Sequence, residues 1–263
     1  MLCSHAMTYL IICSVAALAS LLTFFSGFGL GTLLLPAFAV FFAIEKAVAL
    51  TAIVHFVNGV FKLGLVHRHI DRGVALRFGL TAALGALAGA WLLVQLAGSG
   101  WRIDYTLFGR AVSVTPPQLV IGVLLLVFAL AELRPTAGRR GFPQRWQIPG
   151  GLICGFFGGL AGLQGALRSA FLLNAGLDKA AYVATGAAVA FFIDLSRLAM
   201  YAQLIGQHHA EFDYGLLAAA VLAALAGSVI GKRFLHKATM PTIRKLVALL
   251  LFTVSLGLIS GLL

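Results

Sequence analysis

The sequence predicts an all-α integral membrane protein, a polytopic helical bundle of two inverted repeats with eight to ten membrane elements. Three observations lead to this prediction. Hydrophobic residues make up 61% of the 263 residues and charged residues only 10%, whereas soluble domains carry about 25% charge. Residues 6–44 form an uncharged run that contains a glycine cluster. Several motifs of the first half recur in the same order in the second half, which indicates a duplication.

The uncharged run is too long to be one straight helix in a bilayer. At about 1.5 Å per residue it would extend for roughly 58 Å, nearly twice the hydrocarbon thickness. We therefore expect two elements, residues 7–25 and 30–43, with a break or re-entrant turn at Gly29 and Gly31. Backbone groups freed at such a break must be satisfied by protein or by a water-filled cavity. Transporters place their substrate at broken helices of this kind.

Three transmembrane helices are expected to complete the first repeat, at residues 47–66, 76–96 and 118–133. In the second of them, Gly85 and Gly89 form a small-residue face suited to close helix contact. The polar segment 98–117 is expected to lie outside the membrane as a connection.

A linker rich in Pro, Gly and Arg divides the chain almost in half. The predicted domains are accordingly a first repeat (1–133), a basic linker (134–147) and a second repeat (148–263). The second repeat again begins with an apolar segment that is broken, here between Gly162 and Gly165. Further spans are expected at about 180–205, around the small-residue segment 222–227 and at 246–263.

The distribution of Lys and Arg decides the topology. If each broken segment returns to the side from which it entered, thirteen basic residues share one side: Arg68, Arg72, Arg77, Arg134, Arg139, Arg140, Arg145, Lys179, Lys232, Arg233, Lys237, Arg244 and Lys245. Only Lys46, Arg102 and Arg110 then remain on the other side. This division obeys the positive-inside rule, whereas single crossings would divide the charges almost evenly. We therefore expect opposite orientations for the two halves, a cytoplasmic linker, and both termini outside the cell membrane.

Composition and motifs argue against other classes of protein. The net charge of +11 is explained by basic cytoplasmic loops, because no basic run is interleaved with exposed aromatic residues; no nucleic-acid partner is expected. No cofactor motif and no metal site is expected, since His208 and His209 near Glu211 and Asp213 lie in a loop without a supporting pattern. The first apolar run lacks a basic n-region and a cleavage site, and is expected to be retained. The lipid bilayer is an expected partner, and a homo-oligomer is compatible with the sequence.

Taken together, these motifs resemble the TauE/SafE family of sulfite-exporter-like membrane proteins over about residues 10–263. The resemblance rests on the glycine-rich break followed by Pro36, on the turn and helix start at residues 45–51, on Gly85 with Gly89, and on their recurrence after the basic linker. The family pattern has three adjacent glycines at each break, and the second copy here retains only Gly165. The resemblance implies export or uptake of small sulfur-containing anions such as sulfite or sulfonates.

Arg168 is the first candidate for binding an anion. It follows the second break by three residues, inside an apolar segment, where an arginine is costly unless it faces a partner or an aqueous cavity. A guanidinium beside a helix N-terminus suits an oxyanion and can form bidentate hydrogen bonds with it. Gly29, Gly31, Gly165, Gln164 and Asn58 are the other candidate substrate-binding residues. A structural role, in which Arg168 only pairs with Asp194, remains open.

Four further residues are candidates for ion coupling or for a structural charge pair. Asp194 and Arg197 are three positions apart on one expected helix and can pair on the same face. On the matching helix of the first repeat, His55, Asn58 and Lys62 are spaced by three and four, so we expect them to form one stripe. His55 is either a proton relay or a hydrogen-bonded interior histidine, and Lys62 either faces the site or extends toward the membrane surface.

The sequence favours a secondary transporter of small anions that works by alternating access around the two breaks, rather than an enzyme. Two alternatives remain open. One is an intramembrane enzyme that uses His55, Asp194 and Arg168 on a lipid-soluble substrate. The other is a membrane assembly factor that does not transport. Breaks in matching positions of both halves favour transport, because an enzyme site needs no matching second half.

Overall fold

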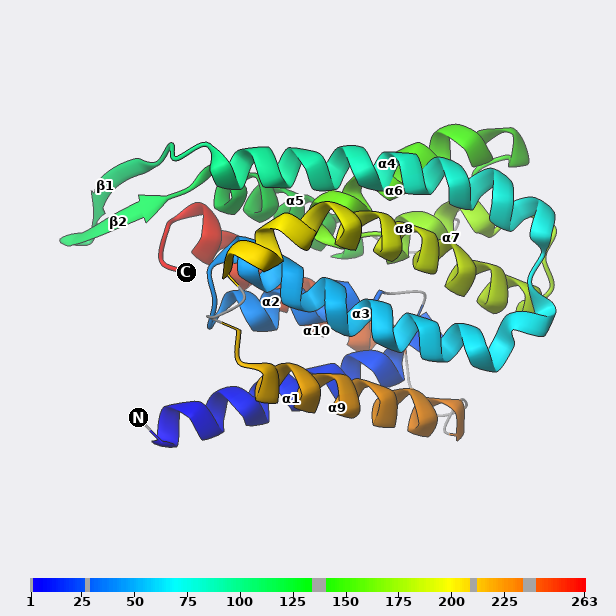
Figure 1. Ribbon diagram of the computed structural model, residues 1–263, viewed down its shortest axis with the longest axis horizontal. Coiled ribbons are helices and arrows are strands. Elements are labelled where there is room, and N and C mark those ends of the chain that lie inside the picture. The colour runs from blue at the N-terminus through cyan, green and yellow to red at the C-terminus, as the bar shows by residue number, and fades with distance from the viewer. Residues whose placement is uncertain (1, 27–28, 134–140, 209–211, 234–239) are drawn as a thin grey trace.

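The protein is described from a computed structural model that covers residues 2–26, 29–133, 141–208, 212–233 and 240–263. Over these residues the chain is almost entirely helical (Figure 1). Its α-helices are α1 (Leu2–Ser26), α2 (Leu30–Ala39), α3 (Ile44–Val66), α4 (Arg72–Gly98), α5 (Pro116–Leu133), α6 (Gln147–Ala161), α7 (Gly165–Leu172), α8 (Lys179–His208), α9 (Tyr214–Arg233) and α10 (Met240–Ile259). Short 3-10 turns η1 (His67–His69) and η2 (Gln144–Trp146) precede α4 and α6.

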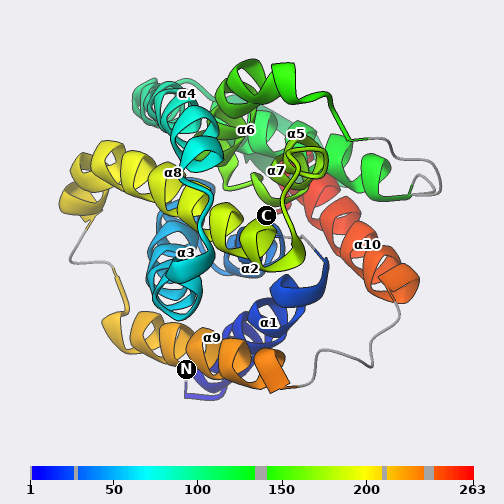
Figure 2. The same cartoon turned by 90° about the vertical axis from the view of Figure 1, so that its right-hand side faces the viewer.

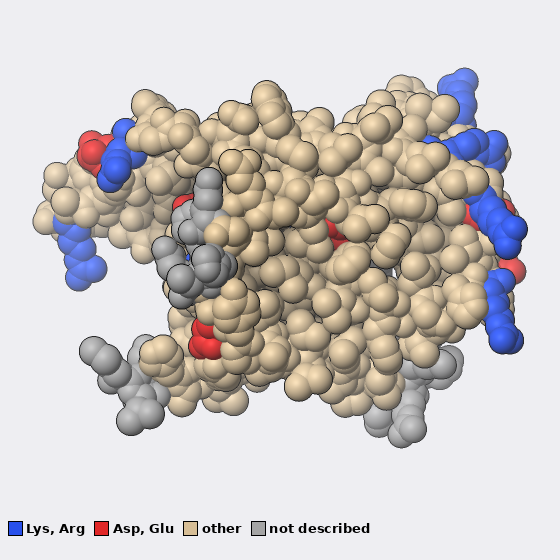
Figure 3. Space-filling model, in the orientation of Figure 1, with Lys and Arg blue, Asp and Glu red and all other residues tan. Residues whose placement is uncertain are grey.

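Within the described residues, six helices are long and apolar enough to cross a membrane: α1, α3, α4, α5, α8 and α9. Large apolar side chains such as Leu10, Leu84 and Leu222 lie exposed on their outer faces, as expected where lipid replaces water. Figure 3 shows charged side chains gathered toward two ends of the molecule, with a broad, almost uncharged belt between them. The prediction of a polytopic helical membrane protein is confirmed.

The polar segment between α4 and α5 corrects the expectation of a wholly α-helical chain. It forms an antiparallel hairpin of β1 (Ile103–Leu107) and β2 (Arg110–Val114). Phe108 and Gly109 turn the chain with φ angles of 50° and 77°, as in the two-residue turns that suit hairpins. The hairpin projects beyond the ends of the helices, at the end of the molecule where both termini lie (Figure 1).

Both predicted helix breaks are present. The first lies between the end of α1 at Ser26 and the start of α2 at Leu30. The second lies between α6 and α7, where Gly162 adopts a left-handed φ of 72° and donates its N–H to the carbonyl of Gly158. Glycine is favoured there because an L side chain is strained at positive φ. With 10 and 8 residues, α2 and α7 reach only about 15 and 12 Å, too short to span about 30 Å of hydrocarbon.

Small residues hold the longest helices in backbone contact. On α4, a Cβ added to Gly89 would stand 2.0 Å from the carbonyl oxygen of Phe156 in α6, and one added to Gly85 would stand 2.2 Å from that of Leu152. On α9, a Cβ added to Gly227 would lie 2.1 Å from the carbonyl oxygen of Ala17 in α1. The predicted small-residue face on the helix of Gly85 and Gly89 is thus confirmed, and α9 uses a glycine in the same way.

The helices surround a central pair, α3 and α8, which lie side by side and run in opposite directions (Figures 1 and 2). Helix α3 starts at the end where both termini lie, and α8 starts at the opposite end. Helix α4 packs against α6 and α8, and α9 packs against α1 and α3. Helices α5 and α10 pack on each other. This arrangement brings both breaks next to the central pair.

Gly89→Ala should lower the thermal stability of the purified protein. The added methyl group has no room against the α6 backbone, and overpacking typically costs about 1–3 kcal/mol. Gly64→Ala is the matched control, because a Cβ at that exposed helical position meets nothing within 4 Å. Unfolding monitored by intrinsic fluorescence in detergent should give a lower midpoint for Gly89→Ala and an equal or higher one for Gly64→Ala. Equal midpoints for the two variants would contradict the close contact.

Candidate functional site

The two helix breaks touch each other. A Cβ added to Gly29 would lie 3.6 Å from both the nitrogen and the Cα of Gly165, at the start of α7. Two residues later, a Cβ added to Gly31 would lie 2.9 Å from the carbonyl oxygen of Gly162. All four glycines are buried. Because a side chain at Gly31 would push the two segments apart, the small residues are what allow the breaks to meet.

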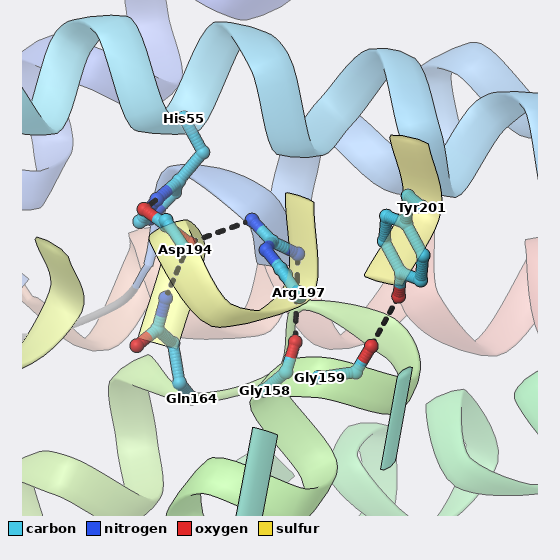
Figure 4. A network of polar contacts seen from close by, with 7 residues as sticks. All are labelled: His55, Gly158, Gly159, Gln164, Asp194, Arg197 and Tyr201. Carbon is cyan, nitrogen blue, oxygen red and sulfur yellow. Dashed lines mark hydrogen bonds and ion pairs between the residues drawn. The ribbon is translucent and has the colours of Figure 1, made fainter. Parts of the chain in front are cut away.

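A buried polar network joins this region to α3 and α8 (Figure 4). Its centre is the carboxylate of Asp194, which is 0% exposed. Nδ1 of His55 lies 2.5 Å from one carboxylate oxygen, and Nη2 of Arg197 lies 2.9 Å from the other. The side-chain amide of Gln164, in the second break, donates to that second oxygen at 3.1 Å. The predicted pairing of Asp194 with Arg197 is therefore present, and His55 and Gln164 belong to the same network.

The network also holds the end of α6. Nη1 of Arg197 donates to the carbonyl oxygen of Gly158 at 3.4 Å, and the hydroxyl of Tyr201 donates to the carbonyl oxygen of Gly159 (Figure 4). These carbonyls lie in the last turn of α6, where a positive charge is favourable. Gly162 leaves room for this contact, since a Cβ there would lie 2.8 Å from Nη1 of Arg197. One side of α8 thus fixes where the second break occurs.

Arg168 lies on α7, and its guanidinium lacks a complete set of partners. Its Nη1 atom is buried and has no hydrogen-bond acceptor among the described residues. The side chain passes Gly186 of α8, where an added Cβ would be 3.5 Å from Nε. It interacts electrostatically with Lys62 and with Asp194, but it forms no ion pair with Asp194 in the part of the chain that the structure describes. The structural role, in which Arg168 only pairs with Asp194, stays a prediction, as does anion binding.

The charges around the breaks do not balance. Asp194 is set against Arg197 and Arg168, so one carboxylate faces two guanidinium groups. Uncompensated charge is costly in a medium of low dielectric constant. An excess of positive charge beside two helix N-termini, those of α2 and α7, makes this region electrostatically suited to an anion.

Asn58 lies apart from this group. Its side-chain carbonyl accepts hydrogen bonds from Ser20 of α1 at 3.2 Å and from Ser228 of α9 at 2.6 Å. His55, on the same helix, is directed toward Asp194, so the stripe expected from His55, Asn58 and Lys62 is divided between two neighbours. Asn58 thus links α3 to α1 and α9 by hydrogen bonds. Lys62 is half-buried and interacts electrostatically with Arg168.

Two polar side chains at the site, Thr51 and Tyr201, were not among the candidates from the sequence. Thr51 is buried beside Gly31, and its hydroxyl has no hydrogen-bond partner among the described residues. Oε1 of Gln164 is likewise buried and unpartnered over the same residues. The repeat itself offered a signal for Thr51, because Thr185 occupies a similar place in the second half. Tyr201 could have been inferred from its position one turn after Arg197 on the same helix face.

The described residues contain no group of three His, Cys, Asp or Glu side chains that could hold a metal ion. His209 and Glu211, part of the loop considered as a metal cluster, lie outside the described residues. Asn174 is exposed and donates to the carbonyl of Gly141 at 2.5 Å. It attaches the end of the linker to the segment after α7.

The apolar helices and the buried charges beside broken segments define a multi-pass membrane protein. A comparison with models of protein families adds a more specific assignment. The model of the sulfite exporter TauE/SafE family matches residues 12–258, nearly the whole chain, so the chain belongs to this family of membrane transporters. Comparison with curated proteins and with solved structures gave no match.

Asp194→Ala should destabilise the protein strongly, because Arg197 would remain buried without its counter-ion. Breaking a buried ion pair typically costs about 3–5 kcal/mol, whereas replacing both charges by apolar residues is often close to neutral. The double variant Asp194→Leu with Arg197→Met should therefore recover part of the lost stability. The measurement is the thermal midpoint of the three purified proteins. A double variant less stable than Asp194→Ala would show that the pair is not the stabilising unit.

Proposed function

We propose that this protein is a secondary transporter of small anions and that sulfite, sulfonates or related organosulfur anions are its substrates. The observation that carries the proposal is the buried Nη1 of Arg168, which has no acceptor among the described residues and belongs to α7, the helix that starts at the second break. An oxyanion would supply the missing acceptor. It would also offset the excess of positive charge. The proposal does not require enzymatic turnover.

The helix packing supports an inverted repeat. If α1 with α2 corresponds to α6 with α7, then α3, α4 and α5 correspond to α8, α9 and α10. Under this correspondence, the contact between α4 and α6 is equivalent to the contact between α9 and α1. In the same way, the contact between α4 and α8 is equivalent to the contact between α9 and α3. All four contacts occur. Gly89 and Gly227 make the same kind of backbone contact in the two equivalent pairs.

In the proposed topology the linker is cytoplasmic and both termini are outside. The termini and the hairpin lie at one end of the molecule (Figure 1). Arg68 and Arg72 lie at the opposite end, between α3 and α4. The positive-inside rule then assigns that opposite end to the cytoplasm. Each broken segment would enter from one side and turn back at its glycines, so that the two breaks reach the same depth from opposite sides.

Alternating access would work by movement of the two halves around the touching breaks. In one state the anion would be held by Arg168 and by the exposed backbone N–H groups at the start of α7, with Gln164 and the Gly29, Gly31 and Gly165 backbone forming the surroundings. Protonation of Asp194 would weaken its hold on Arg197, His55 and Gln164 together. Because Arg197 also binds the end of α6, this proton could be coupled to movement of the second break.

Arg168→Ala should weaken or abolish sulfite flux into proteoliposomes while leaving the protein folded. A hydrogen bond to a charged group contributes about 1.5–3 kcal/mol, so the apparent affinity should fall about 10- to 100-fold. Arg168→Lys should retain part of the flux if charge suffices, and little if bidentate geometry is needed. Arg77→Ala is the matched control, since Arg77 is an exposed arginine in the second turn of α4.

Wild-type flux in Arg168→Ala would remove this residue from the transport site. Flux should also respond to an imposed pH gradient, and independence of that gradient would exclude the proposed proton coupling through Asp194. Chemical turnover of a substrate without any flux would instead favour the intramembrane enzyme.

A further inference from the structure

A second site is a crevice of about 350 Å³ between α3, α4 and α8, which none of the four break glycines lines. This volume is far larger than the share of one water molecule, about 30 Å³. Leu63 of α3 and Leu76 of α4 line its sides, and Ala188, Phe191 and Phe192 of α8 line its floor. The crevice opens toward the outer surface, because Leu76 is 52% exposed. In a membrane-spanning helix bundle that surface faces lipid.

The floor of the crevice is formed by fixed aromatic rings. Phe191 stacks on Phe56 of α3, with ring centroids 5.7 Å apart and planes 27° apart. Phe192 packs over Gly79 of α4, where an added Cβ would lie 2.8 Å from the ring. Both rings are therefore packed against a neighbouring helix.

Arg72 is the only charged side chain that lines this crevice in the described part of the chain. It is exposed and is the first residue of α4. That position is the end of a membrane span, the level at which lipid headgroups lie. Asp71, beside it, is occupied as the cap of α4, where its carboxylate accepts the N–H of Val74 at 2.8 Å. Arg72 forms no ion pair with any described residue. An apolar chain in the crevice would therefore have a cation beside its polar end.

We propose that this crevice binds an anionic phospholipid, with an acyl chain along the rings of Phe191 and Phe192 and the headgroup phosphate on Arg72. Charge complementarity selects this occupant, because basic side chains at the membrane surface attract anionic lipids. The phosphate alone would not bind, since the site offers it one exposed arginine and no further polar groups. The inference does not depend on the transported solute.

Native mass spectrometry of the purified protein tests the site with two lipids of equal acyl chains, phosphatidylglycerol and phosphatidylcholine. The wild type should retain phosphatidylglycerol more strongly. Arg72→Gln should reduce this retention about fivefold, the effect expected for one basic residue near an anionic lipid surface. Arg77→Gln is the matched control, because Arg77 lies on the same helix end, is exposed, and does not line the crevice. Its retention should equal that of the wild type.

Several results would overturn the proposal. Equal retention of the two lipids would mean that the headgroup is not recognised. Equal losses for Arg72→Gln and Arg77→Gln would mean that the charge acts diffusely and not at the crevice. Competition by soluble glycerol 3-phosphate would point to a site for free phosphate esters. Loss of a dimer in Arg72→Gln without loss of lipid would assign the crevice to contact between two copies of the chain.

Discussion

The carboxylate of Asp194 links parts of the chain that would otherwise have no polar connection inside the bilayer. It is contacted by His55 of α3, by Gln164 of the second break and by Arg197 of its own helix. Two of these partners also bear on the second break, because Arg197 binds the end of α6 and Gln164 precedes α7. A carboxylate this deeply buried is stable only while its partners stay in place. Its protonation state and the position of the second break are therefore expected to depend on each other.

The breaks themselves follow from a constraint on backbone groups in lipid. A helix that ends inside the membrane leaves N–H and C=O groups that must find partners in protein or water. At the end of α6, side chains of α8 bind two of the carbonyls. The starts of α2 and α7 lie where the two breaks meet, and Arg168 belongs to α7. The protein thus satisfies the end of α6, and we propose that the positive potential at the starts of α2 and α7 is used by a solute.

Much of the fold could be predicted from the sequence. The length of the uncharged run and its glycines predicted the first break, and the spacing of Gly85 and Gly89 predicted a close helix contact. The hairpin was missed because residues 103–114 are polar and follow a helix. In retrospect, Ile103, Tyr105 and Leu107 alternate with polar residues as in a strand. Short strands outside a membrane have too little apolar area to stand out beside the long helices.

The site could be predicted only in part. Helical spacing placed Asp194 and Arg197 on one face, and depth in an apolar segment singled out Arg168. Spacing could not tell that Asn58 and His55 have different neighbours. They differ by three positions, or about 60° around the helix axis, which is enough to reach α1 and α9 on one side and α8 on the other. Only the packing of the helices determines which neighbour each side chain meets.

The central claim is that the two touching breaks and Arg168 form a binding site for an oxyanion. A thermal-shift screen of the purified protein with sulfite, thiosulfate, sulfonates and carboxylates tests it most directly. A bound anion at a hundredfold excess over its Kd should raise the unfolding midpoint of the wild type by about 5 °C, and that of Arg168→Ala by much less. Equal shifts in both proteins, or no shift with any anion, would contradict the claim.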